Sequence, residues 1–294
     1  MWAVDGLANF LPYAGLPLLL FVAPATFLMR RRMLVVLALI PVVVWVIILL
    51  TPAFFVTLTG HASPNATRLR VVTANVLMSN EQLPTLASDV LAQAPDVVVF
   101  EELRHDLAEV SPVLAATYPY RISTETPWVT VASRFPLEGA RRLAISADDR
   151  GRDLLTATVV ADGQRLTLIA VHFMPPLDAE AFEVNRQQRE VLEAAVADMD
   201  GPVMVAGDFN ATTLSPTFAR LLFGTDLRIA STSRMMSPTY YAYGRLGVRI
   251  DHVLVRNLDV VSDEVFTLTG SDHRGLSVEV GLQPGSNRAL AATR

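Results

Sequence analysis

Hydrophobic and polar residues are distributed unevenly along this chain. Two long runs near the amino terminus, residues 6–29 and 33–60, contain no charged residue, and arginines at 30–32 separate them. A helix needs about 20 predominantly apolar residues to cross the core of a bilayer. The pattern therefore predicts two transmembrane helices, at about residues 7–29 and 33–57.

The first run is open to more than one interpretation. A cleaved signal peptide would begin with basic residues, whereas Asp5 is acidic and the arginines follow the run. A single signal anchor and a buried core hairpin are two further interpretations. Because arginine is enriched in cytoplasmic loops, residues 30–32 predict that the chain after the membrane anchor (residues 1–58) lies outside the cytoplasm. We thus expect a protein integral to the cell membrane, with the lipid bilayer as a partner.

The rest of the chain alternates short apolar runs with amphipathic stretches. Apolar runs bounded by turn residues predict strands at 69–74, 97–100, 128–133, 154–161, 165–172, 203–207, 250–255 and 277–280. Helical periodicity predicts helices at 83–94, 106–117 and 178–199. This mixture predicts an α/β sandwich of two packed sheets with outer helices. The sandwich domain covers 68–282, after a linker at 59–67 and before a disordered tail at 283–294.

Composition excludes several chemistries. The chain has no cysteine, which rules out disulfides, thiolate zinc sites and cysteine nucleophiles. All 24 basic residues are arginine, which rules out a phosphate-binding P-loop and a Schiff-base lysine. From His61 onward, 21 arginines stand against 28 acidic residues, a net charge of about −7. Such an acidic domain argues against high-affinity binding of nucleic acid, which depends on basic patches.

Acidic, amide and imidazole residues gather at the ends of the predicted apolar strands. These residues are Asn75, Glu101, Glu102, His172, Asp208, Asn210, Asp251, Asp272 and His273. Strand ends at a sheet edge aim side chains into a cleft. Carboxylate and amide oxygens suit a hard cation such as Mg²⁺, and a histidine backed by a carboxylate can move a proton or stabilise charge. The residue types therefore predict hydrolysis of a phosphate ester by metal-activated water.

Three motifs resemble a known family. Gly207-Asp208-Phe209-Asn210, Ile250-Asp251-His252 and Ser271-Asp272-His273, in that order, resemble the endonuclease/exonuclease/phosphatase superfamily over residues 69–280. The segments Thr73-Ala74-Asn75-Val76-Leu77 and Glu102-Leu103 resemble its membrane-anchored bacterial branch. The resemblance implies a DNase-I-like, four-layer α/β/β/α sandwich that requires Mg²⁺ or Mn²⁺.

The resemblance also implies roles at the metal site. Glu102 resembles the principal metal ligand of the family, and Asn75 and Asp272 resemble its supporting residues. Glu101 stands where the family usually has Gln, and strand alternation predicts that its side chain points away from the site. The same alternation predicts that His252 is a buried structural histidine on the opposite face from its neighbour.

Five further residues resemble the family's catalytic machinery. Asp208 and Asn210 resemble the pair that orients the attacking water and the phosphate. Asp251 and His273 resemble the carboxylate–imidazole dyad, and His172 resembles the histidine that contacts the phosphate.

The predicted function is that of a membrane-anchored, divalent-metal-dependent phosphoester hydrolase of the phosphodiesterase or nuclease type. Its substrate is a lipid headgroup, a nucleic acid or another phosphodiester, and no stable protein partner is predicted. One alternative is a degenerate, non-catalytic member of the family that acts as a membrane-tethered binding module. A second is a structural membrane protein whose polar strand ends are plain turns. Metal-dependent cleavage of a generic phosphodiester separates the enzyme from both.

Overall fold

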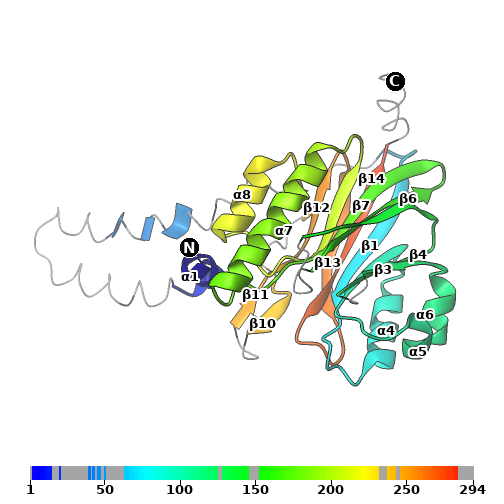
Figure 1. The fold of residues 1–294 in the computed structure, drawn as a ribbon, viewed down its shortest axis with the longest axis horizontal. Coiled ribbons are helices and arrows are strands. Elements are labelled where there is room, and N and C mark those ends of the chain that lie inside the picture. The colour runs from blue at the N-terminus through cyan, green and yellow to red at the C-terminus, as the bar shows by residue number, and fades with distance from the viewer. Residues whose placement is uncertain are drawn as a thin grey trace, which may run out of the picture.

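Two six-stranded β-sheets, packed face to face, form the centre of the protein (Figure 1). The computed structural model describes residues 2–14, 20, 39–40, 42–43, 45–47, 50, 63–124, 128–145, 152–231, 237–242 and 246–283. The predicted tail at 283–294 lies outside these residues except for Gln283.

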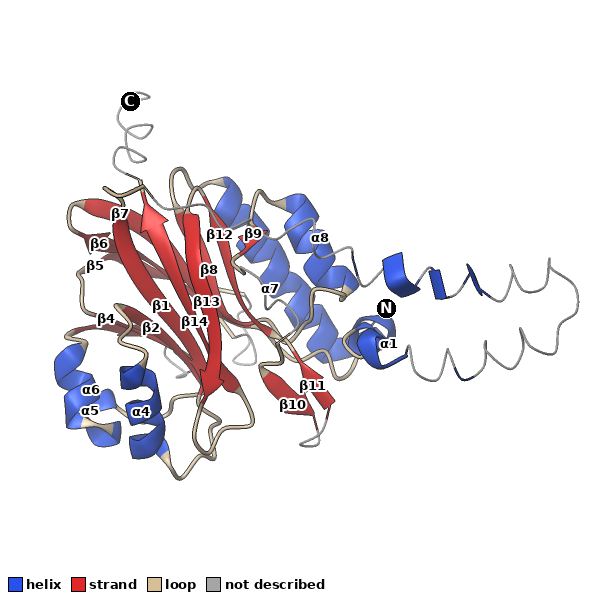
Figure 2. Cartoon of the chain, turned by 180° about the vertical axis from the view of Figure 1, so that it is seen from behind, coloured by secondary structure: helices blue, strands red, loops and turns tan. Residues whose placement is uncertain are grey.

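The first sheet has the strand order β13-β14-β1-β2-β4-β3. Its strands are β1 (Thr67–Asn75), β2 (Val97–Glu101), β3 (Tyr120–Ser123), β4 (Val129–Ser133), β13 (Asp259–Thr267) and β14 (Arg274–Leu282). Three helices cover its outer face (Figure 2): α4 (Leu83–Ala92), α5 (Leu107–Val110) and α6 (Pro112–Thr117).

The second sheet has the strand order β5-β6-β7-β8-β12-β9. Its strands are β5 (Leu137–Leu143), β6 (Leu154–Ala161), β7 (Gln164–His172), β8 (Val203–Asp208), β9 (Arg228–Ile229) and β12 (Asp251–Arg256). The helices α7 (Ala179–Ala197) and α8 (Pro216–Gly224) cover its outer face (Figure 2). A separate two-stranded hairpin consists of β10 (Tyr240–Ala242) and β11 (Leu246–Val248).

Side-chain alternation divides each central strand between two apolar cores. In β1, Leu69 and Val71 face the other sheet, whereas Val72 and Ala74 face the helices. Each fully buried Val or Leu side chain stabilises the fold by about 1.5–3 kcal/mol relative to its exposure to water. Because both faces of these strands are buried, their sequences are nearly continuous apolar runs, and this is what made them recognisable.

The pairing of the central strands brings their polar ends to one end of the sandwich. Strands β1 and β2 are parallel, with Asn75 opposite Glu101. Strands β7 and β8 are also parallel, with His172 opposite Asp208, and β12 is antiparallel to β8, with Asp251 opposite Asp208. Since parallel strands share their carboxyl edge, both sheets present polar side chains at the same end.

The predicted helix at 106–117 is two helices in the structure. Ser111 adopts an extended conformation between α5 and α6, and its side chain accepts a hydrogen bond from the Leu114 backbone N–H. Pro112 follows it, and proline has no N–H to continue the hydrogen bonding of the preceding helix. Strands β3, β5 and β13 were not predicted, because their largely exposed segments lack a clear apolar period. Helix α8 was also missed, although Phe218, Leu221 and Leu222 form a buried apolar face with helical spacing.

The predicted fold class and localisation are wrong in their membrane component. Within the part of the chain that the structure describes, no helix is long and apolar enough to cross a bilayer. The first predicted span was to begin near residue 7, but α1 (Trp2–Ala8) ends at Ala8 and a short 3-10 helix, Leu11–Ala14, follows. Most of both apolar runs, and the arginines at 30–32, lie outside the described residues. Integral membrane localisation and the membrane-anchored branch are therefore not supported.

Gly207 provides a test of how tightly β7 and β8 are joined. It has a φ of +146°, and a Cβ at this position would lie 1.9 Å from the carbonyl oxygen of Val171. We expect Gly207→Ala to lower the free energy of unfolding by about 3 kcal/mol or more, because strain and overlap act together. Guanidinium denaturation measures this loss.

The matched control is Gly163→Ala in the turn between β6 and β7. Gly163 also has a positive φ, +75°, but nothing lies within 4 Å of the added Cβ. Backbone strain alone then costs about 1–2 kcal/mol. Equal losses in the two variants would show that the contact with Val171 is unimportant.

Candidate active site

A cavity of about 490 Å³ opens where the polar strand ends of the two sheets meet. Its polar lining includes Asn75, Glu102, Arg152, His172, Asp208, Asn210 and His273 from or beside the strand ends, together with Asn9 and Tyr240. Asp251 lies behind it in contact with His273. The structure therefore brings together seven of the eight site residues predicted from the sequence: Asn75, Glu102, His172, Asp208, Asn210, Asp251 and His273.

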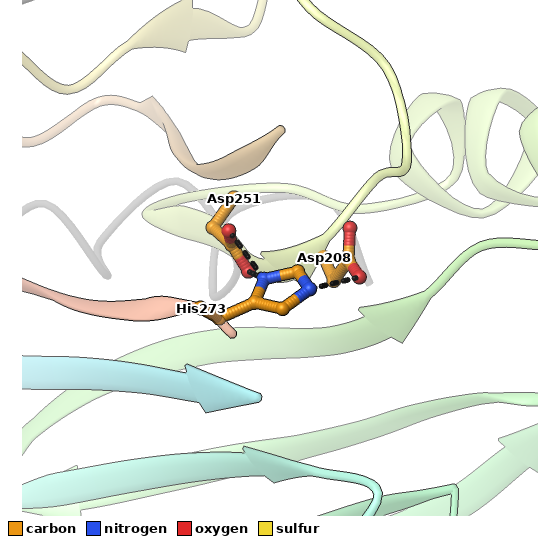
Figure 3. A group of neighbouring side chains, drawn as sticks. All are labelled: Asp208, Asp251 and His273. Atoms are coloured by element: carbon orange, nitrogen blue, oxygen red, sulfur yellow. Dashed lines mark hydrogen bonds and ion pairs between the residues drawn. The ribbon is translucent and has the colours of Figure 1, made fainter. Parts of the chain in front are cut away.

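His273 lies between two buried carboxylates (Figure 3). Its Nδ1 is 2.9 Å from Asp251 Oδ2 and 3.2 Å from Asp251 Oδ1, while its Nε2 is 3.9 Å from Asp208 Oδ2. A carboxylate on one ring nitrogen fixes the orientation of the imidazole and places a proton on that nitrogen. The other nitrogen is directed toward Asp208 and the cavity.

The carboxylates around His273 determine its charge. Burial alone lowers the pKa of His273, but the charges of Asp251, Asp208 and Asp272, with the Asp251 hydrogen bond, raise this pKa to about 10. Burial, and next the charge of Asp251, raises the pKa of Asp208 to about 7. These charges favour the imidazolium form of His273, and burial places the titration of Asp208 near neutral pH, where it can exchange a proton.

The loop after β8 holds Asp208 in place. Asp208 Oδ1 accepts a 2.7 Å hydrogen bond from the Asn210 backbone N–H. Asn210 has a φ of +49°, which turns its side chain back, and its Nδ2 donates to the Phe173 carbonyl at 2.8 Å. This amide therefore ties the ends of β7 and β8 together beside the cavity.

Glu102 and Asp208 face each other from different sheets. The Asn75 amide nitrogen lies between them, 3.4 Å from Glu102 Oε1 and 3.3 Å from Asp208 Oδ2. Glu102 also accepts a 3.0 Å hydrogen bond from the Met78 backbone N–H. Two carboxylates that converge in a partly open cavity are ligands that a hard divalent cation prefers, while Asn75 turns its amide nitrogen toward them and its Oδ1 accepts a 3.1 Å hydrogen bond from the Leu77 backbone N–H. These residues fit Mg²⁺ or Mn²⁺.

We call the polar residues that line the cavity the polar floor. His172 and Arg152 form one side of it, opposite Glu102 and Asn75. His172 Nε2 lies 3.6 Å from both Glu102 Oε1 and Asp208 Oδ2, and 2.5 Å from Arg152 Nη1. Because a guanidinium can only donate, His172 Nε2 accepts this hydrogen bond and the ring is neutral. Burial, and next the charge of Arg152, holds the pKa of His172 well below its usual value.

Arg152 is a site residue that the sequence analysis missed. Its guanidinium carbon lies 4.2 Å from the ring centroid of Trp128, and the residue is partly buried beside the carboxylates. It precedes β6, whereas the search followed polar residues at strand ends, and no motif surrounds it. Within the described cavity lining it is the only arginine, so it is the fixed positive charge available to a phosphate there.

Two acidic residues differ from their predicted positions. Asp272 is exposed and does not line the cavity, although its charge acts on His273, so its role as a metal ligand stays a prediction. Glu101 was predicted to point away, but it is fully buried and accepts a 2.7 Å hydrogen bond from the Thr73 hydroxyl. Glu102 has a φ of +64°, and this left-handed residue interrupts the alternation on which the prediction relied.

Burial favours the uncharged form of Glu101. It raises the pKa of the Glu101 carboxyl well above its usual value, although the Thr73 hydrogen bond acts in the opposite direction. The second oxygen of Glu101, Oε2, has no hydrogen-bond partner among the described residues. A protonated Glu has nearly the shape and hydrogen-bonding capacity of Gln, the residue usual here in the family that the motifs resemble.

A sequence comparison identifies the family. The model described as the endonuclease/exonuclease/phosphatase family matches residues 72–273. The chain belongs to this family. Membership in the endonuclease/exonuclease/phosphatase family supports phosphoester hydrolysis in general. A curated relative, a UPF0294 protein of Yersinia pestis, is 26% identical over 242 residues, which cover 75% of this chain and 86% of that protein.

Solved structures share the fold of the family. An endonuclease/exonuclease/phosphatase from Beutenbergia cavernae is 24% identical with a TM-score of 0.61, covering 73% of this chain and 72% of that one. D. rerio TDP2 complexed with a single-strand DNA product is 17% identical with a TM-score of 0.62, covering 73% and 99%. Sphingomyelinase C from Streptomyces griseocarneus is 21% identical with a TM-score of 0.53, covering 74% and 100%. At these identities the likeness is one of fold.

His252 is the buried structural histidine that alternation predicted. Its side chain is fully buried, its Nε2 is 3.0 Å from the Ala211 carbonyl oxygen, and its ring centroid is 4.5 Å from that of Phe218. Burial, and next the charge of Arg249, lowers the pKa of His252 to about 3. The folded protein therefore keeps His252 neutral at a pH where the unfolded chain protonates it.

This difference predicts acid sensitivity. A histidine whose folded pKa is depressed stabilises the fold fully above its unfolded pKa and less as the pH falls toward its folded pKa. Between pH 7 and pH 5, we expect His252 to account for a loss of about 2 kcal/mol in the free energy of unfolding. His252→Leu should make this loss smaller by that amount, measured by urea denaturation at both values. His105→Leu, at an exposed position, is the control. An unchanged slope in His252→Leu would contradict the assignment.

Proposed function

We propose that this protein is a divalent-metal-dependent phosphoester hydrolase of the phosphodiesterase or nuclease type. The observation that carries the proposal is the convergence of Glu102, His172 and Asp208 from two sheets, with contacts of 3.6 Å, beside an imidazole held by Asp251. Phosphoester hydrolysis needs a site that places a phosphoryl group, a water molecule and positive charge together.

The metal site in this proposal consists of Glu102 and Asn75, with Asp272 as the predicted supporting residue. When bound, Mg²⁺ or Mn²⁺ polarises the phosphoryl oxygens and neutralises part of the charge that develops on them. The carboxylates of Glu102 and Asp208 both lie 3.6 Å from His172 Nε2, so their negative charges are close enough to repel each other. This repulsion favours the binding of a cation.

The chain's own residues supply the proton chemistry. Asp208 accepts a proton from the attacking water, and Asn210 holds that carboxylate in position. As the water oxygen bonds to phosphorus, the bond to the leaving oxygen breaks, and charge accumulates on the phosphoryl oxygens. The His273 imidazolium, stabilised by Asp251, and the pair Arg152–His172 lie where they can stabilise that charge.

The first test concerns the metal ligand. Bis-p-nitrophenyl phosphate should be cleaved with Mg²⁺ or Mn²⁺ and not after EDTA treatment. Glu102→Gln keeps the shape of the side chain but removes its charge, and should lower turnover by at least about 10²-fold or raise the required Mg²⁺ concentration. Release of nitrophenolate measures both effects.

The matched control is the neighbouring substitution Glu101→Gln. Because burial raises the pKa of Glu101 and so favours its uncharged form, the amide replaces a group of similar charge and shape, and most activity should remain. If Glu101→Gln were the inactivating change, the metal-site assignment would be wrong. Metal binding without any turnover, by calorimetry, would support a non-catalytic binding module instead.

The second test concerns the dyad. His273→Ala should lower kcat by at least about 10²-fold, the lower range for a positioned acid–base group. Asp251→Asn should cause part of that loss by releasing the ring. The double variant should be little worse than His273→Ala alone, since residues that act as a unit are not additive. Fully additive losses in steady-state kinetics would show that the two residues act independently.

A further inference from the structure

The amino-terminal segment, residues 2–14, forms one side of the catalytic cavity. Gly6, Asn9 and Phe10 line this cavity together with the polar strand ends. Helix α1 lies beside α8 and the β10–β11 hairpin (Figure 1). The cavity is therefore incomplete without a segment that lies more than fifty residues before the first strand of the sandwich.

A buried carboxylate fixes α1 to α8. Asp5 is 2% exposed and accepts hydrogen bonds from the Ser215 hydroxyl at 2.8 Å and from the Thr217 backbone N–H at 3.0 Å. The Thr217 hydroxyl also lies 2.8 Å from Asp5 Oδ2. Ser215 is the N-cap of α8, where a negative charge is stabilised by unpaired N–H groups and by the helix dipole. These hydrogen bonds therefore attach α1 specifically to the first turn of α8.

Two further hydrogen bonds fix the rest of the segment. Asn9 Oδ1 accepts a 2.8 Å hydrogen bond from the Thr212 backbone N–H, two residues after Asn210. The Tyr13 hydroxyl donates to the Gly247 carbonyl at 2.7 Å, in the β10–β11 hairpin. The segment is thus tied both to the loop that follows Asp208 and to the hairpin on the other side of the cavity.

Apolar side chains make up the lining that is not polar. These residues, which we call the apolar rim, are Phe10, Pro175, Pro176, Leu177, Val248 and Ile250. Leu177 is 76% exposed although it lines the cavity, and Gly6 of α1 lies against Pro176. On α1 itself, Val4 and Leu7 are 61% and 72% exposed. The segment that borders the cavity thus also carries exposed apolar side chains.

The lining thus has two chemically distinct parts. The polar floor has one arginine and a cation-binding donor set, which suit a single phosphodiester group. The described lining lacks the row of basic residues that would follow a nucleic-acid backbone. A substrate whose hydrocarbon chains cover the apolar rim binds more tightly, since each buried methylene group lowers the free energy of binding.

We infer that the substrate is a phospholipid molecule, with its phosphodiester on the polar floor and its acyl chains along the apolar rim. This inference rests on the proposed function, because it names the substrate class of the same site. The segment of residues 2–14 is then a specificity determinant: Phe10 contacts the acyl chain, and Asp5 positions the segment through α8.

The test compares two phosphodiesters that differ only in their acyl chains. Dihexanoylphosphatidylcholine, kept below its micelle concentration, carries the chains, and glycerophosphocholine lacks them. Cleavage by the full-length protein with Mg²⁺ is followed by phosphorus NMR. We expect kcat/KM to be at least about tenfold higher with the chains, the gain from burying about two methylene groups.

Variants locate that preference on the rim. Leu177→Asp and Phe10→Ser should each lower the ratio of the two kcat/KM values by at least about fivefold, because a polar group replaces apolar contact area. Asp5→Asn, which weakens the attachment of α1, should lower the same ratio. Val113→Asp is the matched control, since Val113 is 63% exposed on α6, which covers the outer face of the other sheet, and does not line the cavity.

The remaining outcomes separate this inference from the proposed function. Equal kcat/KM for both phosphodiesters would overturn the inference, and so would equal losses on both substrates in the rim variants. If bis-p-nitrophenyl phosphate is still cleaved in these cases, the proposed hydrolase function stands. Faster cleavage of a single-stranded oligonucleotide than of either choline ester would assign the site to nucleic acid instead. Failure to cleave any of these substrates would overturn both.

Discussion

Burial of several carboxyl groups at one end of the sandwich is the constraint on which the site depends. Glu101, Glu102, Asp208 and Asp251 all lie at or behind the cavity, and three of the four are almost fully buried. Buried like charges cannot all remain ionised without compensation. The protein compensates in three ways: burial favours the uncharged form of Glu101, Asp251 is paired with His273, and Glu102 and Asp208 both lie within reach of the Asn75 amide.

The scaffold creates this crowding through strand pairing. Parallel pairs in each sheet bring their carboxyl ends to a common edge, and face-to-face packing brings the two edges together. Gly207 allows β7 and β8 to approach closely enough for His172 and Asp208 to share one cavity. The apolar cores above the site keep these strand ends rigid, so that a water molecule, a phosphate and a cation meet groups that are already oriented.

Much of the domain could be predicted because buried strands have a simple signature. Continuous apolar runs marked β1, β2, β7 and β8, and polar residues at their ends marked Asn75, His172 and Asp208. The alternation of side-chain directions along a strand correctly placed His252, because β12 is regular. It misplaced Glu101, because the next residue, Glu102, adopts a left-handed conformation that the sequence does not reveal. Arg152 was missed because it precedes a strand. The membrane prediction rested on hydropathy alone, whereas α1 ends at Ala8 and no helix among the described residues is long and apolar enough to cross a bilayer.

The attachment of α1 also has a consequence for the order in which the molecule is completed. Asp5 and Thr217 are separated by 212 positions, and Tyr13 and Gly247 by 234. Contacts between such distant residues form late in folding, because a long loop must be closed before they contribute. During synthesis, the amino-terminal segment emerges first but has no binding site until α8 and the β10–β11 hairpin exist. The wall of the cavity is therefore among the last parts to assemble, because its attachment points at Thr217 and Gly247 are synthesised more than two hundred residues after it.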